Sequence, residues 1–365
     1  MLIGIHAKFL SEAHPTGVGK YARKLLEHML LLPETREHRF RLYSDARYAL
    51  HVTRYSSVEV RTLRAPLLWT QARLGWELAW RAPDIFFTPQ HVLPCTAPKR
   101  STVTVHGLEF ERYPQYYPWN ERVYLRQVTR DAARRAACII AVSQTTKNDL
   151  MELYRVPEEK IAVVYHGTPA PLAQFPIPNF QFPNISGAPY FLYIGRIEKK
   201  KNVDGVVRAF EIARERHGLP HKLVLVGSDG HGAKEIRSKI LDSKPKNDIE
   251  IMGYVAEEQK WELLRGAEAL LLPSWYEGFG LPILEAQSVG IPVITSNISA
   301  MPEVAGSGAF YIDPADPESV AQAMQKVASD EGFREGLIKK GLENAGRFSW
   351  EKCAKETLAA LQNGV

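Results

Sequence analysis

Short apolar segments recur along the chain, and each is followed by a longer stretch in which apolar residues have helical spacing. In the first half they read LIGI, FRLYS, DIFFTP, STVTVHG, CIIAVS and IAVVYHG, and in the second YFLYIGR, KLVLVGS, IEIMGYV, EALLLPS, IPVITSN and AFYIDP. Brief runs rich in Val and Ile that end in Gly, Pro or Ser are typical of buried parallel strands in βα units. The pattern predicts an α/β protein with two doubly wound, Rossmann-like domains.

A proline-rich stretch separates the two sets of predicted strands. Residues 168–189 contain six prolines, which neither a helix nor the interior of a sheet accommodates. We therefore predict a first domain over 1–170, a semi-rigid connector over 168–189 and a second domain over 190–348. The final segment, about 349–365, is predicted to be an amphipathic helix, with apolar residues near one face (Trp350, Ala354, Thr357 and Leu358).

Composition is that of an ordinary folded protein. The 365 residues are 45% hydrophobic and 24% charged, which is enough to build two cores. The three cysteines are far apart, so they predict neither a disulfide framework nor a zinc site, and they favour a cytoplasmic location. No apolar run approaches the roughly 20 residues of a membrane-spanning helix. The opening MLIGIHAKF predicts a first strand rather than a signal peptide.

Charge is distributed unevenly along the chain. Residues 1–170 hold 24 Lys and Arg against 16 Asp and Glu, a balance of +8, whereas the remainder holds 22 against 25, a balance of −3. An anionic partner is therefore expected to meet the first half. We expect no nucleic-acid partner.

Two glutamates, Glu277 and Glu285, flank a glycine-rich turn between a predicted strand and a predicted helix. Pro282 suits the first position of that helix, where its missing N–H would be unsatisfied anyway. A helix N-terminus offers N–H groups and a partial positive charge, and glycines let a ligand approach the backbone. The turn could therefore bind an anion through the residues Gly278, Phe279, Gly280 and Leu281, or it could be an ordinary strand–turn–helix connection with a capping glutamate.

Two interpretations of the glutamate pair compete. The carboxylates could be an acid/base pair acting on a glycosidic bond, or they could hold a ligand whose phosphates lie on the turn. Arg196 and Lys201 follow another predicted strand in YIGRIEKKKN, and this pairing suits a diphosphate, although a basic run can also be simply solvated. The acid/base interpretation leaves both cations without a role, so the sequence favours the phosphate ligand.

Two motifs of the first half lie where open α/β sheets bind ligands, after the carboxyl ends of strands. Gly17 and Gly19 are predicted to form a short glycine loop before a helix. His106 directly follows the strand STVTV, and both a structural and a catalytic role are open for it.

Taken together, these motifs resemble the retaining glycosyltransferases of family 4, which have the GT-B fold of two Rossmann-like domains facing across a cleft. EGFGLPILE matches the Glu-x7-Glu signature of that family, and YIGRIEKKKN matches its Gly-Arg-x4-Lys motif. The resemblance covers nearly the whole chain, and it extends through TGVGKYARKLL, VHGLEFERYP, AVSQTTKNDL, SNISAMPEVAG and FSWEKCAKETL.

The resemblance implies a role for each matching residue of the second domain. Arg196 and Lys201 would hold the diphosphate of a nucleotide-sugar donor, helped by the backbone after Gly280. Glu277 would bind hydroxyls of the transferred sugar and Glu285 the ribose. Two further residues, Tyr254 and Val255, would lie near the base.

In the first domain, the resemblance places His106 beside the reacting sugar and Gly17 to Gly19 near the leaving phosphate. It also implies catalytic roles for His106, Glu277, Arg196 and Lys201, and a final helix that crosses back onto the first domain. Two positions depart from the family pattern. Gly107 stands where the family often has Asp, and His6 stands in IHAK where the family often reads IDAR.

The chemistry implied is transfer of a hexose with retention of the anomeric configuration, in which Glu277 binds the sugar rather than attacking it. We expect no cofactor and no essential metal, because no Asp-x-Asp follows a predicted strand. The segments RGAEALLLPSWYEGFGLPILEA and VHGLEFERYP resemble mannosyltransferases that use GDP-mannose to build surface polysaccharide. A UDP-sugar transferase, a nucleotide-sugar epimerase of the same fold and a non-enzymatic binding protein remain as alternatives.

A membrane surface is a further candidate partner of the first domain, because the acceptors of such enzymes are often lipid-linked. Four arginines recur every fourth residue along one predicted helix (Arg122, Arg126, Arg130 and Arg134). Upstream, three tryptophans stand among arginines (Trp69, Trp76 and Trp80 with Arg64, Arg73 and Arg81). This composition suits the headgroup layer of a membrane. The alternatives are a solvated helix face and tryptophans packed in the core.

Overall fold

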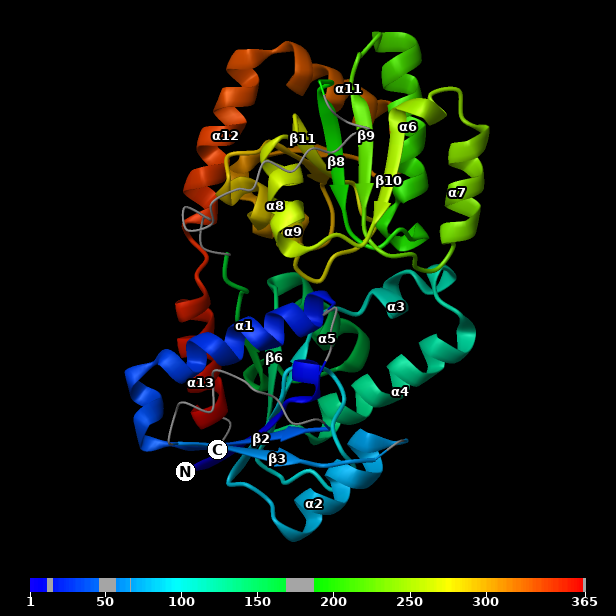
Figure 1. The fold of residues 1–365 in the computed structure, drawn as a ribbon. Helices are drawn as coiled ribbons and strands as arrows, with labels where there is room; N and C mark the ends of the chain where they lie inside the picture. The colour runs from blue at the N-terminus through cyan, green and yellow to red at the C-terminus, as the bar shows by residue number, and fades with distance from the viewer. Residues whose placement is uncertain (12–15, 46–56, 66, 169–186, 364–365) are drawn as a thin grey trace. The chain divides into compact units, whose positions relative to one another are not determined.

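The chain forms two units, each built on its own parallel sheet (Figure 1). The structure is a computed structural model, and it describes residues 1–365 except 12–15, 46–56, 66, 169–186 and 364–365. Unit 1 comprises Met1–Arg112, Pro118–Gly167 and Phe348–Val365, and unit 2 comprises Tyr113–Tyr117 and Thr168–Arg347. The predicted connector falls almost wholly outside the described residues.

Unit 1 contains a seven-stranded sheet in the order β3-β2-β1-β4-β5-β6-β7. The strands are β1 (Leu2–His6), β2 (Arg39–Ser44), β3 (Val58–Thr62), β4 (Ile85–Thr88), β5 (Ser101–Val105), β6 (Cys138–Ala141) and β7 (Ile161–Val163). The helices are α1 (Gly17–Leu31), a π-helical segment (Trp69–Leu74) that continues into α2 (Gly75–Trp80), α3 (Glu109–Arg112), α4 (Trp119–Arg135), α5 (Gln144–Tyr154) and α13 (Trp350–Asn363). All pairings are parallel, as predicted, but β3 was not predicted.

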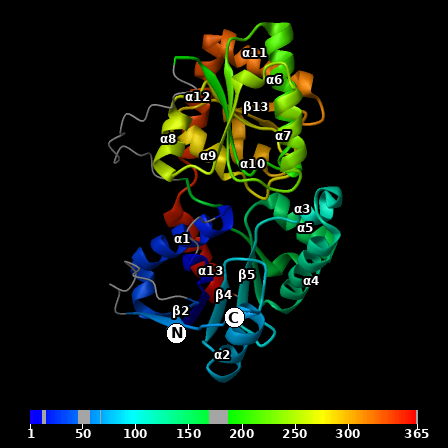
Figure 2. The same ribbon diagram turned by 45° about the vertical axis from the view of Figure 1, so that its right-hand side comes forward.

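Unit 2 contains a six-stranded parallel sheet in the order β10-β9-β8-β11-β12-β13. The strands are β8 (Tyr190–Ile194), β9 (Lys222–Val226), β10 (Ile249–Gly253), β11 (Ala269–Leu272), β12 (Val293–Ser296) and β13 (Ala309–Ile312). The helices are α6 (Val203–His217), α7 (Ala233–Asp242), α8 (Glu257–Arg265), α9 (Leu281–Ser288), α10 (Met301–Ala305), α11 (Pro317–Ser329) and α12 (Glu331–Ala345). Helices α6 and α7 lie on one side of the sheet and α8 and α9 on the other (Figure 2). The central strands are buried on both faces, which accounts for their continuous apolar sequences.

Helix α13 belongs to unit 1 although it comes last in the chain. It packs against α1, and its predicted apolar face is buried, including Trp350, Ala354 and Leu358. The Trp350 ring stacks on His166 with centroids 6.1 Å apart. Gly167 lies so close that a Cβ atom there would be 2.1 Å from the backbone nitrogen of Trp350. The residues that follow β7, which end at Gly167, therefore pack tightly against this helix.

A five-residue aromatic segment, Tyr113–Tyr117, groups with unit 2, although the sequence analysis placed it in the first domain. The rings of Tyr113 and Tyr116 lie 6.3 and 6.4 Å from Trp275. The ammonium of Lys200 donates to the Tyr117 hydroxyl at 2.7 Å. The segment thus packs against the loop that follows β11, which carries Trp275.

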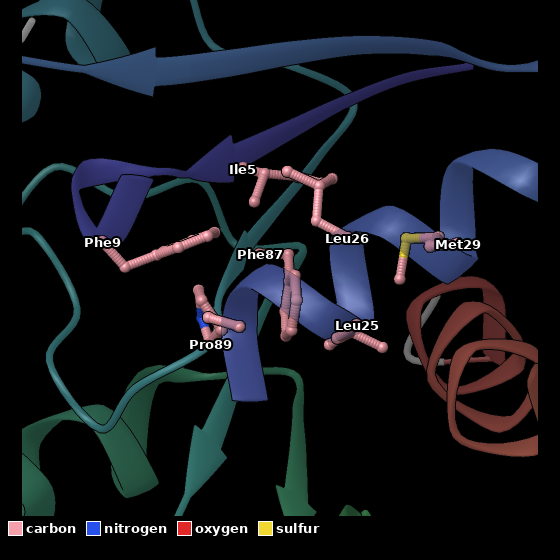
Figure 3. A pocket seen from close by; sticks show the side chains of 8 residues that line it. Ile5, Phe9, Leu25, Leu26, Met29, Phe87 and Pro89 are labelled. Atoms are coloured by element: carbon pink, nitrogen blue, oxygen red, sulfur yellow. The ribbon is translucent and has the colours of Figure 1, made fainter. Parts of the chain in front are cut away.

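A small cavity in unit 1 lies between β1 and α1 (Figure 3). All of its lining residues are apolar: Ile5, Phe9, Ala22, Leu25, Leu26, Met29, Phe87 and Pro89. An apolar lining offers nothing that would bind a phosphate or a sugar hydroxyl. The cavity is therefore part of the packing of unit 1 rather than a candidate site.

Candidate active site

Glu277 lies on the loop after β11, and its carboxylate is held from two sides. The ammonium of Lys201 is 2.6 Å from one carboxylate oxygen and 2.5 Å from the other. The hydroxyl of Ser274 donates to Oε1 at 2.7 Å. Because only 8% of the residue is exposed, its charge depends on these partners rather than on water.

The backbone of Glu277 is fixed as well. The hydroxyl of Ser299 donates to the Glu277 carbonyl at 2.7 Å and accepts from the Glu277 N–H at 3.2 Å. Ser299 itself has a left-handed backbone, with φ of 57°. Glu277 is therefore preorganised before any ligand arrives, which suits a group that positions a reacting sugar.

The predicted anion-binding turn leads into the N-terminus of α9. Gly280 is the N-cap residue, with φ of 99°, a conformation that other residues rarely adopt. Leu281 begins the helix, one residue earlier than predicted, so Pro282 is its second residue. The first N–H groups of a helix point away from it along its axis. The structure thus has the local geometry of an anion site directly after Glu277.

Arg196 projects from a rigid loop after β8. Its side chain is 56% exposed, and its Nε is 4.0 Å from the carboxylate of the buried Glu198. The Tyr193 hydroxyl donates to the Arg196 carbonyl at 2.8 Å. Gly227 after β9 has φ of 146°, and a Cβ atom there would be 1.8 Å from the carbonyl oxygen of Gly195. The guanidinium is thus accessible to a ligand while its backbone is fixed.

The three consecutive lysines after Arg196 have three different partners. Lys199 forms an ion pair with Glu235, Lys200 contacts Tyr117, and Lys201 binds Glu277. The run is therefore not simply solvated. The resemblance assigns Lys201 to the donor diphosphate, and the structure places it against the predicted sugar ligand Glu277.

Glu285 lies in the second turn of α9 and is paired with a lysine that the sequence analysis did not single out. Lys260 on α8 is 4% exposed, and its ammonium is 2.7 Å from Oε1 of Glu285. Burial alone would lower the pKa of Lys260, but Glu285 and Glu257 outweigh it and raise the pKa. Lys260 shares the buried side of α8 with Leu263 and Leu264, so a lysine at an apolar position was the missed signal.

The predicted base contacts, Tyr254 and Val255, lie on the loop between β10 and α8. Gly253 ends β10 with φ of 67°, and the Tyr254 side chain that follows is 52% exposed. The same loop leads directly into the helix that carries Lys260. The residues assigned to the base thus lie on the segment that leads to Lys260, the partner of the predicted ribose ligand Glu285.

His106 directly follows β5 in unit 1, as predicted. Its Nε2–H donates to the carbonyl of Pro89 at 2.9 Å, because a carbonyl can only accept, and this leaves Nδ1 as the acceptor nitrogen. Burial lowers the pKa of His106 to about 4, so the ring is neutral at pH 7. The Tyr21 ring meets it edge-on at 4.9 Å. The geometry suits a neutral hydrogen-bond acceptor better than a proton donor.

Two protein-family models match the chain, "Glycosyltransferase Family 4" over residues 15–170 and "Glycosyl transferases group 1" over residues 178–344. The chain belongs to glycosyltransferase family 4. The O-antigen chain mannosyltransferase B of Escherichia coli is 28% identical to this family 4 enzyme over 369 residues, which span 95% of this chain and 96% of the relative.

Solved structures show that this family 4 enzyme has the GT-B fold. Sucrose-phosphate synthase from Thermosynechococcus elongatus superposes with a TM-score of 0.76 at 19% identity, covering 100% of this chain and 98% of that one. The Anabaena protein HepE in complex with UDP-glucose superposes with a TM-score of 0.71 at 18% identity, covering 99% of each chain.

The prediction of a glycine loop before α1 in this family 4 enzyme is wrong. Gly17 and Gly19 lie inside the first turn of α1, which begins at Gly17 with Thr16 as its N-cap residue. The sequence signal was misread because glycine usually weakens a helix. Both residues remain at the N-terminal end of α1, where the free N–H groups of a helix can bind an anion.

The two departures from the family pattern have local explanations. Gly107 has φ of 142°, so an aspartate there would be strained. His6 ends β1 in a buried position, and the Gln90 amide donates to its Nδ1 at 3.1 Å. Burial lowers the pKa of His6 to about 4, so the side chain is a neutral polar group at the carboxyl edge of the sheet.

Proposed function

We propose that this family 4 enzyme transfers mannose from GDP-mannose to a saccharide or lipid-diphosphate-linked saccharide acceptor in surface polysaccharide synthesis. The observation that carries the proposal is the similarity to O-antigen chain mannosyltransferase B along almost the full length of both chains. The arrangement in unit 2 supports it, because Arg196, Glu277, Glu285 and the N-terminus of α9 supply groups for a diphosphate, a hexose and a ribose.

The proposed reaction breaks the bond between the anomeric carbon and the donor phosphate oxygen, and the electron pair leaves with the diphosphate. The acceptor hydroxyl bonds to the same face of the ring, and its proton passes to the departing phosphate. Arg196, Lys201 and the N-terminus of α9 would stabilise the departing negative charge, so the reaction needs no metal. Glu277 would hold the sugar hydroxyls without forming a covalent intermediate.

A nucleotide panel tests the donor. Thermal stability of the full chain is measured with GDP, UDP and ADP, each at about 100 times its dissociation constant. A ligand at that concentration stabilises the folded state by about 2.7 kcal/mol, and we expect GDP to reach this effect at the lowest concentration. Stabilisation at a lower concentration of UDP than of GDP would identify a UDP-sugar transferase instead.

Incubation with the donor alone distinguishes a transferase from an epimerase of the same fold. A transferase should at most hydrolyse GDP-mannose slowly, with EDTA present or absent, and should transfer mannose once a saccharide acceptor is added. Conversion of the donor into another nucleotide sugar would contradict the proposal.

We also propose that unit 1 meets an anionic membrane surface at the cytoplasmic face, but not through the arginine stripe of α4. The Arg126 guanidinium binds the carboxylate of Glu111 at 2.8 Å, and the Arg130 guanidinium lies 5.0 Å from the centre of the Tyr154 ring. Arg126 and Arg130 thus have partners on α3 and α5, so the stripe is only partly available to lipid. In the described residues, no helix is long and apolar enough to cross a bilayer.

The segment from the π-helical turn through α2 is the better surface. Trp69 is buried and its indole N–H donates to the Leu63 carbonyl, but Trp76 and Trp80 are 54% and 79% exposed, so the interpretation of these two as core is wrong. Leu68, which caps this segment, is 75% exposed. Exposed arginines flank the segment at Arg64 and Arg81. Tryptophan and leucine beside arginine suit the interface of an anionic bilayer.

Vesicle co-sedimentation tests this surface. Replacing both Trp76 and Trp80 with alanine is expected to weaken binding to anionic vesicles by roughly 10- to 100-fold, because each indole buries apolar area in the interface. Trp119→Ala is the matched control, since Trp119 is 77% exposed on α4. If the control and the double variant lose binding equally, or if neither does, α2 is not the membrane surface.

A further inference from the structure

A buried ion pair connects the predicted ribose ligand to α8, a helix to which the family resemblance gives no role. Lys260 on α8 contacts Glu285 on α9, and the two side chains are only 5% and 10% exposed. The two residues come from helices on either side of β11 in the sequence. An ion pair with so little exposure is neither a surface feature nor a part of the apolar core.

The contacts of Lys260 show what this ion pair does to Glu285. The ammonium lies 2.7 Å from Oε1 of Glu285, 2.5 Å from a carboxylate oxygen of Glu257 and 4.6 Å from the centre of the Trp261 ring. Glu257 is 48% exposed, so water also screens its charge, whereas Glu285 is buried. The ion pair therefore matters more for Glu285 than for Glu257.

A carboxylate that binds neighbouring hydroxyls must be ionised and fixed in direction. An ionised carboxylate can accept from two hydroxyls of one ribose, because both of its oxygens have lone pairs available. A buried carboxylate without a cation tends to take up a proton and to lose half of that accepting capacity. The Lys260 ammonium is such a cation at Oε1 of Glu285, and its hydrogen bond restricts the rotation of the Glu285 side chain.

We propose that Lys260 is a positioning residue that keeps the Glu285 carboxylate aimed at the ribose hydroxyls of the donor, and that it thereby sets the preference for ribonucleotide over deoxyribonucleotide donors. This inference rests on the proposed function, which assigns Glu285 to the ribose. Lys260 does not touch the donor in this role. It acts through Glu285.

Kinetics of Lys260→Met give the first test, because methionine keeps the length of the side chain and removes the charge. A ribose contact is made equally in the ground and transition states, so its loss raises KM and leaves kcat nearly unchanged. We expect the donor KM to rise roughly 10- to 150-fold, the range for one charge-assisted contact. Glu257→Gln is the matched control. It removes the exposed partner of the same lysine, and we expect less than about a threefold change in KM.

Binding of GDP and 2′-deoxy-GDP separates positioning from a general structural effect. The wild type should bind GDP about tenfold or more tightly than 2′-deoxy-GDP, which is the effect of one hydrogen bond to a charged group. Lys260→Met should lose that preference. Equal weakening of both nucleotides by Lys260→Met would overturn the inference. If the nucleotide panel shows that UDP stabilises the protein at a lower concentration than GDP, then UDP and 2′-deoxy-UDP are compared in the same way.

Two further outcomes are informative. If the wild type binds GDP and 2′-deoxy-GDP equally, the assignment of Glu285 to the ribose fails, and the inference fails with it, whereas donor identity and transfer are unaffected. Lys260→Arg keeps the positive charge, and it serves as the test if Lys260→Met does not fold. Lys260→Arg should retain most of the ribose preference, and complete loss of the preference in this variant would contradict the role of the charge.

Discussion

Lys201→Met is expected to lower kcat/KM for the donor by roughly 100- to 1,000-fold, which corresponds to about 3–4 kcal/mol. Two losses combine in this variant. The cation assigned to the departing diphosphate disappears, and Glu277, which is buried, loses the ammonium that binds both of its carboxylate oxygens. Steady-state kinetics with the donor identified by the nucleotide panel measure the effect.

The lysine run provides its own control for this prediction. Lys199 lies in the same short turn, but it forms an ion pair with Glu235, away from Glu277. Lys199→Met should therefore change kcat/KM by less than about threefold, as expected for an exposed ion pair. Addition of Glu277→Gln to Lys201→Met should cost less than the sum of the two single changes, because the two residues form one pair. Indistinguishable kinetics for the Lys199 and Lys201 variants would remove Lys201 from the site.

Gly227→Ala is expected to have the largest effect on stability. The backbone at Gly227 has φ of 146°, and a Cβ atom would be 1.8 Å from the carbonyl oxygen of Gly195. The backbone strain and the clash together should lower the free energy of unfolding by on the order of 2–4 kcal/mol. For a unit of this size, that change lowers Tm by about 5–10 °C. Because the clash pushes on the peptide before Arg196, donor binding should weaken as well.

Gly218→Ala separates backbone strain from the clash. Gly218 follows α6 with φ of 63°, and a Cβ atom there would meet nothing within 4 Å. Its replacement should cost only about 1 kcal/mol, the strain of a left-handed residue, and donor binding should be unchanged. A Tm for Gly227→Ala equal to that for Gly218→Ala would show that the loops after β8 and β9 do not meet as the structure has them.

The sequence predicted the buried strands well and the edge of the first sheet poorly. A strand buried on both faces must be apolar throughout, so runs such as ALLL in β11 are recognisable without any knowledge of their neighbours. Strand β3 has the sequence VEVRT, lies at the edge of the sheet and is only partly buried. Glu59 is exposed and the other residues are only partly buried, so β3 lacks the continuous apolar run by which the buried strands were recognised.

In the site, too, residues of one sequence motif were predicted, whereas residues that lie far away in the sequence were missed. Glu277, Gly280 and Glu285 stand in one motif, so their relation to the turn and to α9 is fixed by a few residues of sequence. Lys260 and Ser299 reach the two glutamates from 25 and 22 positions away, and only the fold brings them together. The start of α1 at Gly17 was misjudged because propensity disfavours glycine in a helix, whereas the structure has the exposed Gly17 as the first helical residue.

The placement of α13 in unit 1 has a consequence for biosynthesis. The sheet of unit 1 is complete once β7 has been made, yet the residues that cover α1 are among the last of the chain, Trp350–Asn363. At 5–20 residues per second, the ribosome takes roughly 10–40 s to add the residues between β7 and α13, and unit 2 can fold during that time. The domain that is translated first is therefore the one that finishes folding last. A nascent chain that stops before Trp350 leaves the apolar surface of α1 uncovered, and it should require chaperone protection until α13 is made.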